Sequence, residues 1–399
     1  MAEEKAEKKD EKRDFLGHLR SMVAMGASDL HVKVGAPPTY RIDGVLYPMD
    51  ERPCSVADLD ELGDTVLSQT RREIFVREHE LDVSFSIPGV ARYRVNFCVQ
   101  RGTPGASFRL VPMTIPTLEG LALPEVLGEL VQKSNGLILV TGATGSGKST
   151  TVASMIDHVN HLTTRKIVTV EDPIEYLHRD DRCLIYQREV GHDTHTFAHA
   201  LRHVLRQDPD IIMIGEIRDA ESLTIALNAA NTGHLVLSTL HTADAIQSIQ
   251  RILTFYEPHE QDEIRRVLGD NLRAVVSQRL LPRIGGQGRL PAVEIMLNTP
   301  TIREYILEPT KTVMIRDAIQ SGATQYKMQS FDQAMLQMVE KKLVSPESAI
   351  QHASRPNEFA LYLQGILGTS TNVFATTELK ALDSPLPDKE PDWIQRKAA

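Results

Sequence analysis

With 399 residues, 41% of them hydrophobic and 24% charged, the chain has the length of two folded domains and the composition of a soluble globular protein. No apolar run approaches the ~20 residues that span a bilayer, the N-terminus is polar, and the three cysteines form no CxxC pair. These features argue against membrane insertion, secretion and a zinc ribbon, and we expect a cytoplasmic protein. The formal net charge of −9 argues against a general affinity for nucleic acid.

The first 112 residues predict a charged tail followed by a small α+β domain over residues 15–112. Residues 1–14 contain no large apolar side chain and are expected to be disordered. Apolar residues at helical spacing from Phe15 predict a helix that ends near Gly26. The remaining elements follow from alternating or helical patterns: strands over 28–34 and in a hairpin over 40–47, helices over 56–69 and 71–78, and strands over 81–87, 91–100 and 105–111.

A second domain is expected over residues 125–367. Residues 113–124 are rich in proline and predict an extended linker between the two domains. Strand and helix patterns then alternate, which is typical of a parallel α/β sheet. After about Ala323 the pattern becomes mostly helical, and residues 368–399 are expected to be disordered.

The segment Gly142–Ser149 reads Gly-Ala-Thr-Gly-Ser-Gly-Lys-Ser between an apolar strand and a helix pattern over 150–161. Such a loop wraps phosphates with its backbone N–H groups, and the helix that follows directs its positive end at the same anion. Lys148 reaches the β- and γ-phosphates and Ser149 ligates Mg²⁺ in this motif. The sequence therefore predicts ATP and Mg²⁺ binding by Gly142, Thr144, Gly145, Ser146, Gly147, Lys148, Ser149 and Thr150.

Three further apolar strands end in reactive side chains, and ligands of parallel α/β sheets lie beyond the carboxyl ends of the strands. Residues 167–170 run into Glu171, Asp172 and Glu175, any of which is positioned to orient the attacking water; position alone does not choose between them. Residues 211–214 end at Gly215-Glu216, a magnesium-binding strand whose carboxylate comes one residue late. We therefore expect Glu216 to hold Mg²⁺ through a water.

Two histidines, His234 and His241, flank the strand over 234–239. They are candidates to read the γ-phosphate or relay its loss, although a histidine near a strand is often structural. Arg94 and Arg109 lie on successive predicted strands of the first domain, and either is a candidate to neutralise charge on the γ-phosphate. The sequence does not align the two arginines across their strands.

These motifs together resemble a PilT-type motor of the type IV pilus, within the secretion ATPase superfamily. The resemblance covers roughly residues 15–367 and is highly specific. It is carried by the phosphate loop and by Gly26–His31, an Asp box at Thr169–Tyr176, Gln187–Gly191, Leu205–Asp219 and a His box at Gly233–His241.

The resemblance implies a fold, a function and an assembly. It implies a PAS-like N-terminal domain linked to a RecA-like ATPase domain, and a homohexameric motor that hydrolyses ATP to retract the pilus in twitching motility. It assigns Glu175 as the catalytic glutamate, Glu216 as the magnesium-binding acid, and Arg94 and Arg109 as arginine fingers. It also implies association with an inner-membrane platform protein of the PilC type and with a paralogous motor subunit.

Some segments depart from the retraction-motor pattern and leave alternatives open. Residues 300–308 keep Ile302, Arg303 and Ile306 of the late AIRNLIRE motif but not the rest, and residues 329–333 and 354–358 resemble PilU-type accessory motors. The alternatives are therefore a PilU-like accessory motor, or a type II secretion or pilus assembly ATPase, against which the missing zinc cysteines count. A nucleic-acid translocase and a nucleotide-sensing ring subunit without turnover are disfavoured.

Overall fold

The computed structural model describes residues 13–285 and 288–363, and the chain divides into two compact units. Unit 1 comprises the chain up to Thr114 together with Pro173–Leu177. Unit 2 comprises Ile115–Asp172 and the chain from His178 onward. The expected tail over 368–399, and all but the last two residues of the tail over 1–14, lie outside the described residues. The predicted domain boundaries remain a proposal.

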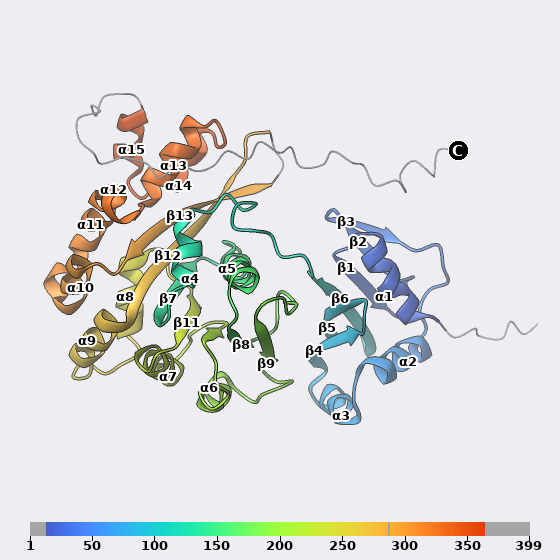
Figure 1. The fold of residues 1–399 in the computed structure, drawn as a ribbon. Helices are drawn as coiled ribbons and strands as arrows, with labels where there is room; N and C mark the ends of the chain where they lie inside the picture. Colours follow the sequence, from blue (N-terminus) through green and yellow to red (C-terminus); the bar gives the residue numbers. More distant parts are fainter. Residues whose placement is uncertain (1–12, 286–287, 364–399) are drawn as a thin grey trace, which may run out of the picture. The chain divides into compact units, whose positions relative to one another are not determined.

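Unit 1 is built on an antiparallel sheet of six strands in the order β3-β2-β1-β6-β5-β4 (Figure 1). Asp43 and Gly44, both with positive φ, form the tip of the predicted hairpin, as a two-residue turn between twisted strands requires. All predicted strands of this region form: β1 (Asp29–Lys33), β2 (Thr39–Ile42), β3 (Val45–Pro48), β4 (Glu80–Ile87), β5 (Ala91–Gln100) and β6 (Thr103–Val111).

Three helices accompany this sheet: α1 (Phe15–Ala24), α2 (Val56–Val66) and α3 (Gln69–Glu78). Ser55 begins α2 with a capping box, in which its hydroxyl and the Asp58 carboxylate each accept a backbone N–H. The helix predicted over 56–69 ends at Val66 instead, because Ser68 caps the next helix. Apolar residues of α1, α2 and the sheet form the core of the unit.

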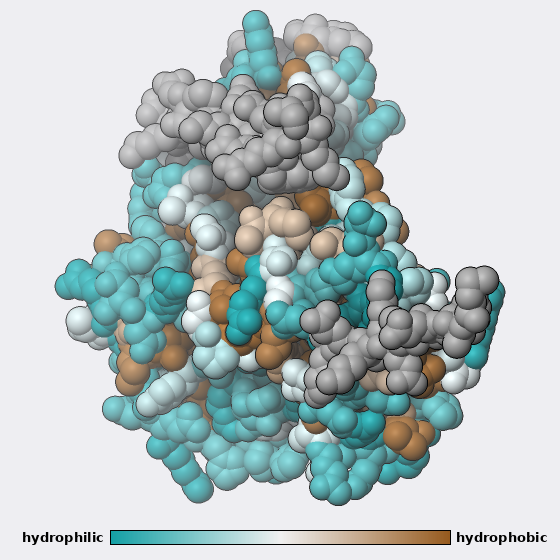
Figure 2. All heavy atoms as spheres, turned by 90° about the vertical axis from the view of Figure 1, so that its right-hand side faces the viewer, coloured by the Kyte–Doolittle hydropathy of each residue, from teal (hydrophilic) through white to brown (hydrophobic). Residues whose placement is uncertain are grey.

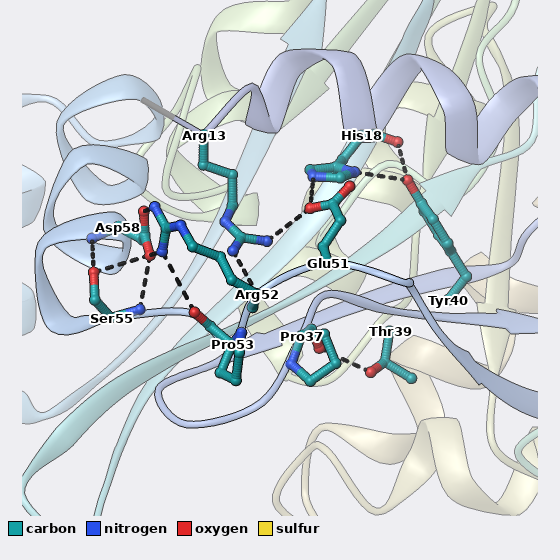
Figure 3. A network of polar contacts seen from close by, with 10 residues as sticks. All are labelled: Arg13, His18, Pro37, Thr39, Tyr40, Glu51, Arg52, Pro53, Ser55 and Asp58. Carbon is teal, nitrogen blue, oxygen red and sulfur yellow. Dashed lines mark hydrogen bonds and ion pairs between the residues drawn. The ribbon is translucent and has the colours of Figure 1, made fainter. Parts of the chain in front are cut away.

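A polar network joins separate segments of unit 1 (Figure 3). The Arg13 guanidinium donates to Glu51 Oε2 at 2.9 Å, and His18 Nε2 lies 3.3 Å from the same oxygen. Tyr40 donates its hydroxyl to the His18 carbonyl at 2.9 Å. These contacts hold the chain before α1 and the loop after β3 in place, where buried polar groups need partners.

Unit 2 contains a sheet of seven strands in the order β13-β12-β7-β11-β10-β8-β9. All neighbouring strands are parallel except β13, which pairs antiparallel with β12. The four strands predicted to carry the site are adjacent, as β7-β11-β10-β8. The strands are β7 (Gly136–Gly142), β8 (Lys166–Glu171), β9 (Leu184–Glu189), β10 (Ile211–Ile214), β11 (Leu235–Leu240), β12 (Leu272–Pro282) and β13 (Arg289–Leu297).

Helices cover both faces of this sheet (Figure 1). Alternate residues of one strand face opposite layers: Leu137 and Leu139 pack with α6–α10, whereas Ile138 and Val140 pack with α4 and α5. Such strands are apolar throughout because both faces are buried. The helices are α4 (Val126–Val131), α5 (Lys148–Leu162), α6 (Phe197–Val204), α7 (Ala220–Asn231), α8 (Ala245–Leu253), α9 (Gln261–Asn271) and α10 (Pro300–Leu307).

The end of the described chain is helical, as the sequence predicts. Phe331, at the start of α13, lies under the Arg279 guanidinium of β12 at 3.9 Å from the ring centroid, within a core shared with the β12–β13 hairpin. The elements are η1 (Pro309–Met314), α11 (Ile315–Ser321), α12 (Ala323–Tyr326), α13 (Phe331–Glu340), α14 (Pro346–His352) and α15 (Pro356–Leu363).

The visible surface is mainly polar. In Figure 2, hydrophilic side chains cover most of the face drawn, and hydrophobic side chains appear in scattered patches between them. Within residues 13–285 and 288–363, none of the helices is both long enough and apolar enough to cross a membrane. Scattered apolar side chains of this kind are ordinary for a protein surface.

Candidate nucleotide-binding site

The loop between β7 and α5 has the backbone that a phosphate-binding loop requires. Gly142, Gly145 and Gly147 have φ of 148°, 77° and 92°, a region that side chains disfavour. A Cβ on Gly142 would lie 2.5 Å from Ser146 Oγ and 2.6 Å from the Gln278 carbonyl oxygen. Only glycine therefore fits there, and the backbone is kept open for close approach by an anion.

Two polar side chains of this loop, those of Lys148 and Ser146, are buried. Lys148 is 7% exposed, and its ammonium donates to the carbonyl oxygens of Gly142 and Ala143 at 2.9 and 3.0 Å. The buried Ser146 hydroxyl has no hydrogen-bond partner among the described residues. An anion would satisfy such a group, and the first N–H groups of α5 lack partners within the helix. The loop therefore fits a phosphate.

Glu216 follows β10 and is held by two neighbours. Its side chain, 19% exposed, is paired with Arg218, and His241 Nε2 lies 3.0 Å from its Oε2. Arg218 Nη1 lies 3.4 Å from Asp172 Oδ2, so groups from the ends of β8, β10 and β11 form one chain of charges. The hydrogen bond to Glu216 raises the pKa of Arg218, against the effect of burial. Arg218 belongs to the motif Leu205–Asp219, but no local pattern indicates its role.

Gly215, one residue before Glu216, lies close to the neighbouring strand β8. Its N–H donates to the Val170 carbonyl at 2.8 Å, and a Cβ would lie 3.3 Å from that oxygen. The side chain that would occupy this position would press on β8. A side chain at this position would therefore crowd β8 by a few tenths of an ångström.

The two predicted histidines lie at opposite ends of β11. Leu235 pairs with Gly136 and Leu240 with Thr141, so His241 adjoins the phosphate loop and His234 lies at the amino edge. His234 Nδ1 donates a hydrogen bond to the Ala229 carbonyl, at 3.0 Å, in the last turn of α7. The structure does not bring His234 together with the other predicted site residues.

The three candidate carboxylates after β8 have different surroundings. Glu171 is buried, and its Oε1 accepts from Thr169 at 2.6 Å and from Gln187 at 3.1 Å. Asp172 faces Arg218. Glu175 is exposed, and no hydrogen bond or ion pair holds its side chain within the described part of the chain. It lies on the segment Pro173–Leu177, which belongs to unit 1.

Arg94 and Arg109 face each other directly across β5 and β6 of unit 1. Residues opposite each other in an antiparallel pair share a face of the sheet, and like charges so placed repel. Arg109 Nε donates to Asp29 Oδ1 at 2.8 Å. Although burial raises it, hydrogen bonds from Ser28 and Arg109 hold the pKa of Asp29 below its usual value. Arg94 is half-buried and, among the described residues, has no ion-pair partner.

Gln278, on β12, is a further residue of this region that the sequence did not single out. It lies opposite Gly142 in the parallel pair of β12 and β7, and its Nε2 donates to Thr151 Oγ1 of α5 at 2.8 Å. Its side chain thus connects β12 to the first turn of α5 by a hydrogen bond. No motif marks this residue, because its position follows from the strand order.

The fold and the loop define a phosphate-loop nucleotide-binding protein with a RecA-like sheet, and comparison with known proteins agrees. Residues 121–342 match the family described as Type II/IV secretion system protein. The type IV pilus retraction ATPase PilT of Pseudomonas aeruginosa is 43% identical over 84% of this chain and 96% of its own. The type IV pilus ATPase PilU of the same organism is 38% identical over 95% of this chain and 98% of its own.

A solved structure, of the pilus retraction motor PilT with bound ADP, matches with a TM-score of 0.80 and 40% identity over 87% of this chain and 98% of that chain. The chain therefore belongs to the Type II/IV secretion system protein family and, within it, to the PilT-type pilus retraction ATPases. The expected architecture, a PAS-like α+β domain followed by a RecA-like domain with a helical C-terminal part, is confirmed.

Proposed function

We propose that this chain hydrolyses ATP at the carboxyl edge of the unit 2 sheet and uses the energy, as a homohexamer, to retract a type IV pilus. One observation carries the proposal: adjacent strands end in the phosphate loop and in the Glu216–His241 pair, in a chain 43% identical to PilT. Groups placed where phosphate charge develops are what phosphoryl transfer requires.

The residues present fit Mg²⁺ as well as ATP. Ser149 at the start of α5 and Glu216 after β10 supply a hydroxyl and a carboxylate, the oxygen ligands that Mg²⁺ prefers. When bound, Mg²⁺ neutralises charge on the β- and γ-phosphates. Because Glu216 already pairs with Arg218 and His241, we infer that it holds the ion through a water. Lys148 leaves its loop carbonyls to bind the phosphates.

Glu175 is proposed to orient and deprotonate the attacking water. Of the three acids after β8, Glu171 is buried in hydrogen bonds and Asp172 faces an arginine, so Glu175 alone presents an exposed carboxylate without such a partner among the described residues. A general base needs a free lone pair within reach of the water.

Arg94 and Arg109 are proposed to act as arginine fingers on the nucleotide of a neighbouring subunit. Their alignment on one face of the sheet supports this, because two guanidinium groups held together gain from an anion between them. Mixing Arg94→Ala subunits with Lys148→Ala subunits tests action in trans. Mixed rings should recover part of the ATPase activity that each variant lacks alone. The same mixing experiment is repeated with Arg109→Ala in place of Arg94→Ala. No recovery at any ratio would contradict the proposal.

The same proposal places the protein in the cytoplasm, at the inner membrane through the pilus machinery. Its partners would be a platform protein of the PilC type and a paralogous motor subunit. A deletion strain tests the direction of work: cells should carry excess pili and lose twitching motility, counted by electron microscopy and plate assays. Cells without pili would indicate an assembly motor instead.

A PilU-like accessory motor is the second candidate. The match to PilU extends over 95% of this chain, against 84% for PilT. Two segments typical of PilU also meet in the structure, where the Ser354 N–H donates to Asp332 Oδ1 at 2.7 Å. Deletion separates the candidates: loss of an accessory motor leaves retraction in the presence of the primary motor, with lower force in an optical trap, whereas loss of the primary motor abolishes retraction.

A further inference from the structure

Three histidines follow one another along the start of α6, outside the nucleotide-binding residues. His195, His199 and His203 are spaced four residues apart and all three are exposed. His199 and His203 lie one turn apart on α6, and His195 precedes Thr196, which caps this helix. The ring centroids of His195 and His199 lie 5.4 Å apart, and those of His199 and His203 lie 5.0 Å apart. His199 is thus the common member of two close imidazole pairs.

Both separations suit a shared metal ion. Two imidazoles that bind one ion through nitrogens at about 2.0 Å, at a near-tetrahedral angle, place their ring centroids about 5 Å apart. Histidines four residues apart on a helix are a known metal-binding arrangement. The Thr194 hydroxyl lies 3.4 Å from His199 Nδ1 and so leaves Nε2 as the nitrogen available to an ion.

The surroundings of His199 include two arginines, Arg188 and Arg202. Burial lowers the pKa of His199, and the neighbouring His203, His195, Arg188 and Arg202 lower it further. Arg202 is itself paired with Glu221 of α7, which reduces its repulsion of a cation.

We propose that His195, His199 and His203 form a site for a divalent transition metal, bound by His199 together with either neighbour. Imidazole nitrogens suit Zn²⁺, Cu²⁺ and Ni²⁺, whereas Mg²⁺ prefers oxygen. Among residues 13–285 and 288–363, no group of three or more histidine, cysteine, aspartate or glutamate side chains is arranged to hold one ion. The site is accordingly a two-histidine one with open positions for water.

The proposal is tested by titrating the full-length chain with Zn²⁺ in a calorimeter, without nucleotide. Because loss of a supporting residue alone weakens metal binding by about 10- to 100-fold, His199→Ala should weaken it by at least about tenfold. His195→Ala and His203→Ala should each keep one pair and bind within about tenfold of the wild type. His259→Ala, at an exposed histidine on another segment, is the matched control and should change nothing.

Electron paramagnetic resonance with Cu²⁺ counts the ligands directly. The wild type should show hyperfine coupling to two imidazole nitrogens, and His199→Ala should lose the two-nitrogen signal. His199→Asn and the double variant His195→Ala/His203→Ala provide further tests if His199→Ala fails to fold, and both should lose the signal as well. An unchanged Zn²⁺ isotherm and Cu²⁺ spectrum in these variants, or an equal loss in His259→Ala, would overturn the proposal.

Discussion

The two edges of the unit 2 sheet carry similar side chains but use them differently. At the carboxyl edge, His241 contacts Glu216 across two strand ends, and Lys148 lies over the phosphate loop. At the amino edge, His234 donates to the last turn of α7, and Lys166 donates to the Gln207 carbonyl and lies 5.0 Å from the Tyr186 ring centroid. The same residue types thus lie among the proposed nucleotide-binding groups at one edge and satisfy backbone carbonyls at the other.

The difference has a physical origin in the parallel sheet. Every strand from β7 to β11 delivers its carboxyl end, with the loop that follows, to one edge, where helix N-termini with free N–H groups also begin. At the amino edge His234 satisfies a carbonyl in the last turn of α7, and Lys166 satisfies a carbonyl of the loop between α6 and β10. Paired substitutions at the two edges test this division.

The largest effect is expected for Lys148→Ala, with Lys166→Ala as its counterpart at the amino edge. Loss of the ammonium removes charged hydrogen bonds to the phosphates in both the bound and the transition state, so kcat/KM for ATP should fall by roughly 10,000-fold. Lys166→Ala should keep kcat/KM for ATP within about twofold of the wild type and lower only the free energy of unfolding, by about 1 kcal/mol. Steady-state phosphate release and chemical denaturation measure the two quantities. Equal losses of turnover at both edges would contradict the division.

Glu175→Gln should come next. Without a general base, kcat should fall by about 100- to 1,000-fold, while nucleotide affinity stays within about threefold because the phosphate loop is intact. Fluorescent nucleotide binding and phosphate release separate the two. The matched control is Glu129→Gln, an exposed acid paired with Lys327 on unit 2, which should leave both values unchanged. Unchanged turnover in Glu175→Gln would remove this residue from the mechanism.

The histidines give a smaller and more specific contrast. His241→Ala removes a hydrogen bond to a charged group worth about 1.5–3 kcal/mol, which corresponds to a loss of about 10- to 100-fold in kcat if that bond positions Glu216. His234→Ala should keep kcat and lower the free energy of unfolding by about 1 kcal/mol. A loss of turnover in His234→Ala that matches the loss in His241→Ala would show that the edge does not decide the role.

The last contrast concerns the dependence of stability on pH, with no expected loss of turnover, and involves a buried acid at the start of α8. Glu294 of β13 accepts the Ala245 N–H at 3.0 Å, and burial raises its pKa to about 7 from an ordinary 4.5. Between these two values the folded protein binds a proton that the unfolded chain has lost. Its contribution to stability is therefore complete below pH 4.5 and declines as pH rises to about 7, by up to about 3 kcal/mol.

Glu294→Gln keeps a neutral side chain of the same shape and should flatten this part of the profile. Urea unfolding at several pH values, compared between wild type and variant, isolates the contribution of this residue. Parallel profiles for the two proteins would show that Glu294 is not protonated in the folded state. The variant should also retain turnover at pH 6, because the amide oxygen of the glutamine accepts the Ala245 N–H in place of the carboxyl oxygen.

Much of the site follows from the sequence because strand ends and motifs coincide. The phosphate loop, Glu216 and His241 were predicted from local pattern alone, and the parallel sheet brings them to one edge. The prediction that His234 and His241 share one role is wrong for His234. Seven residues along a strand span its whole length, about 20 Å, so the two histidines lie at opposite edges of the sheet. A motif shows which strand a residue belongs to but not which edge it reaches.

Other features depend on contacts that local sequence does not encode. The register that sets Arg94 opposite Arg109 follows from the turn between β5 and β6, and the pairing of Arg218 with Glu216 depends on a loop conformation. The additional strands β9, β12 and β13 complete the sheet around the four predicted ones. That Pro173–Leu177 belongs to unit 1 depends on long-range packing.

The central claim, that ATP hydrolysis at this edge retracts pili, is tested most directly by watching labelled pili in living cells that carry Glu175→Gln in place of the wild-type chain. In this strain we expect pili to extend but no longer retract, so that cells accumulate fibres and stop twitching. A control strain with Glu129→Gln should retract normally. Retraction at the wild-type rate and frequency in the Glu175→Gln strain would show that this site does not drive retraction.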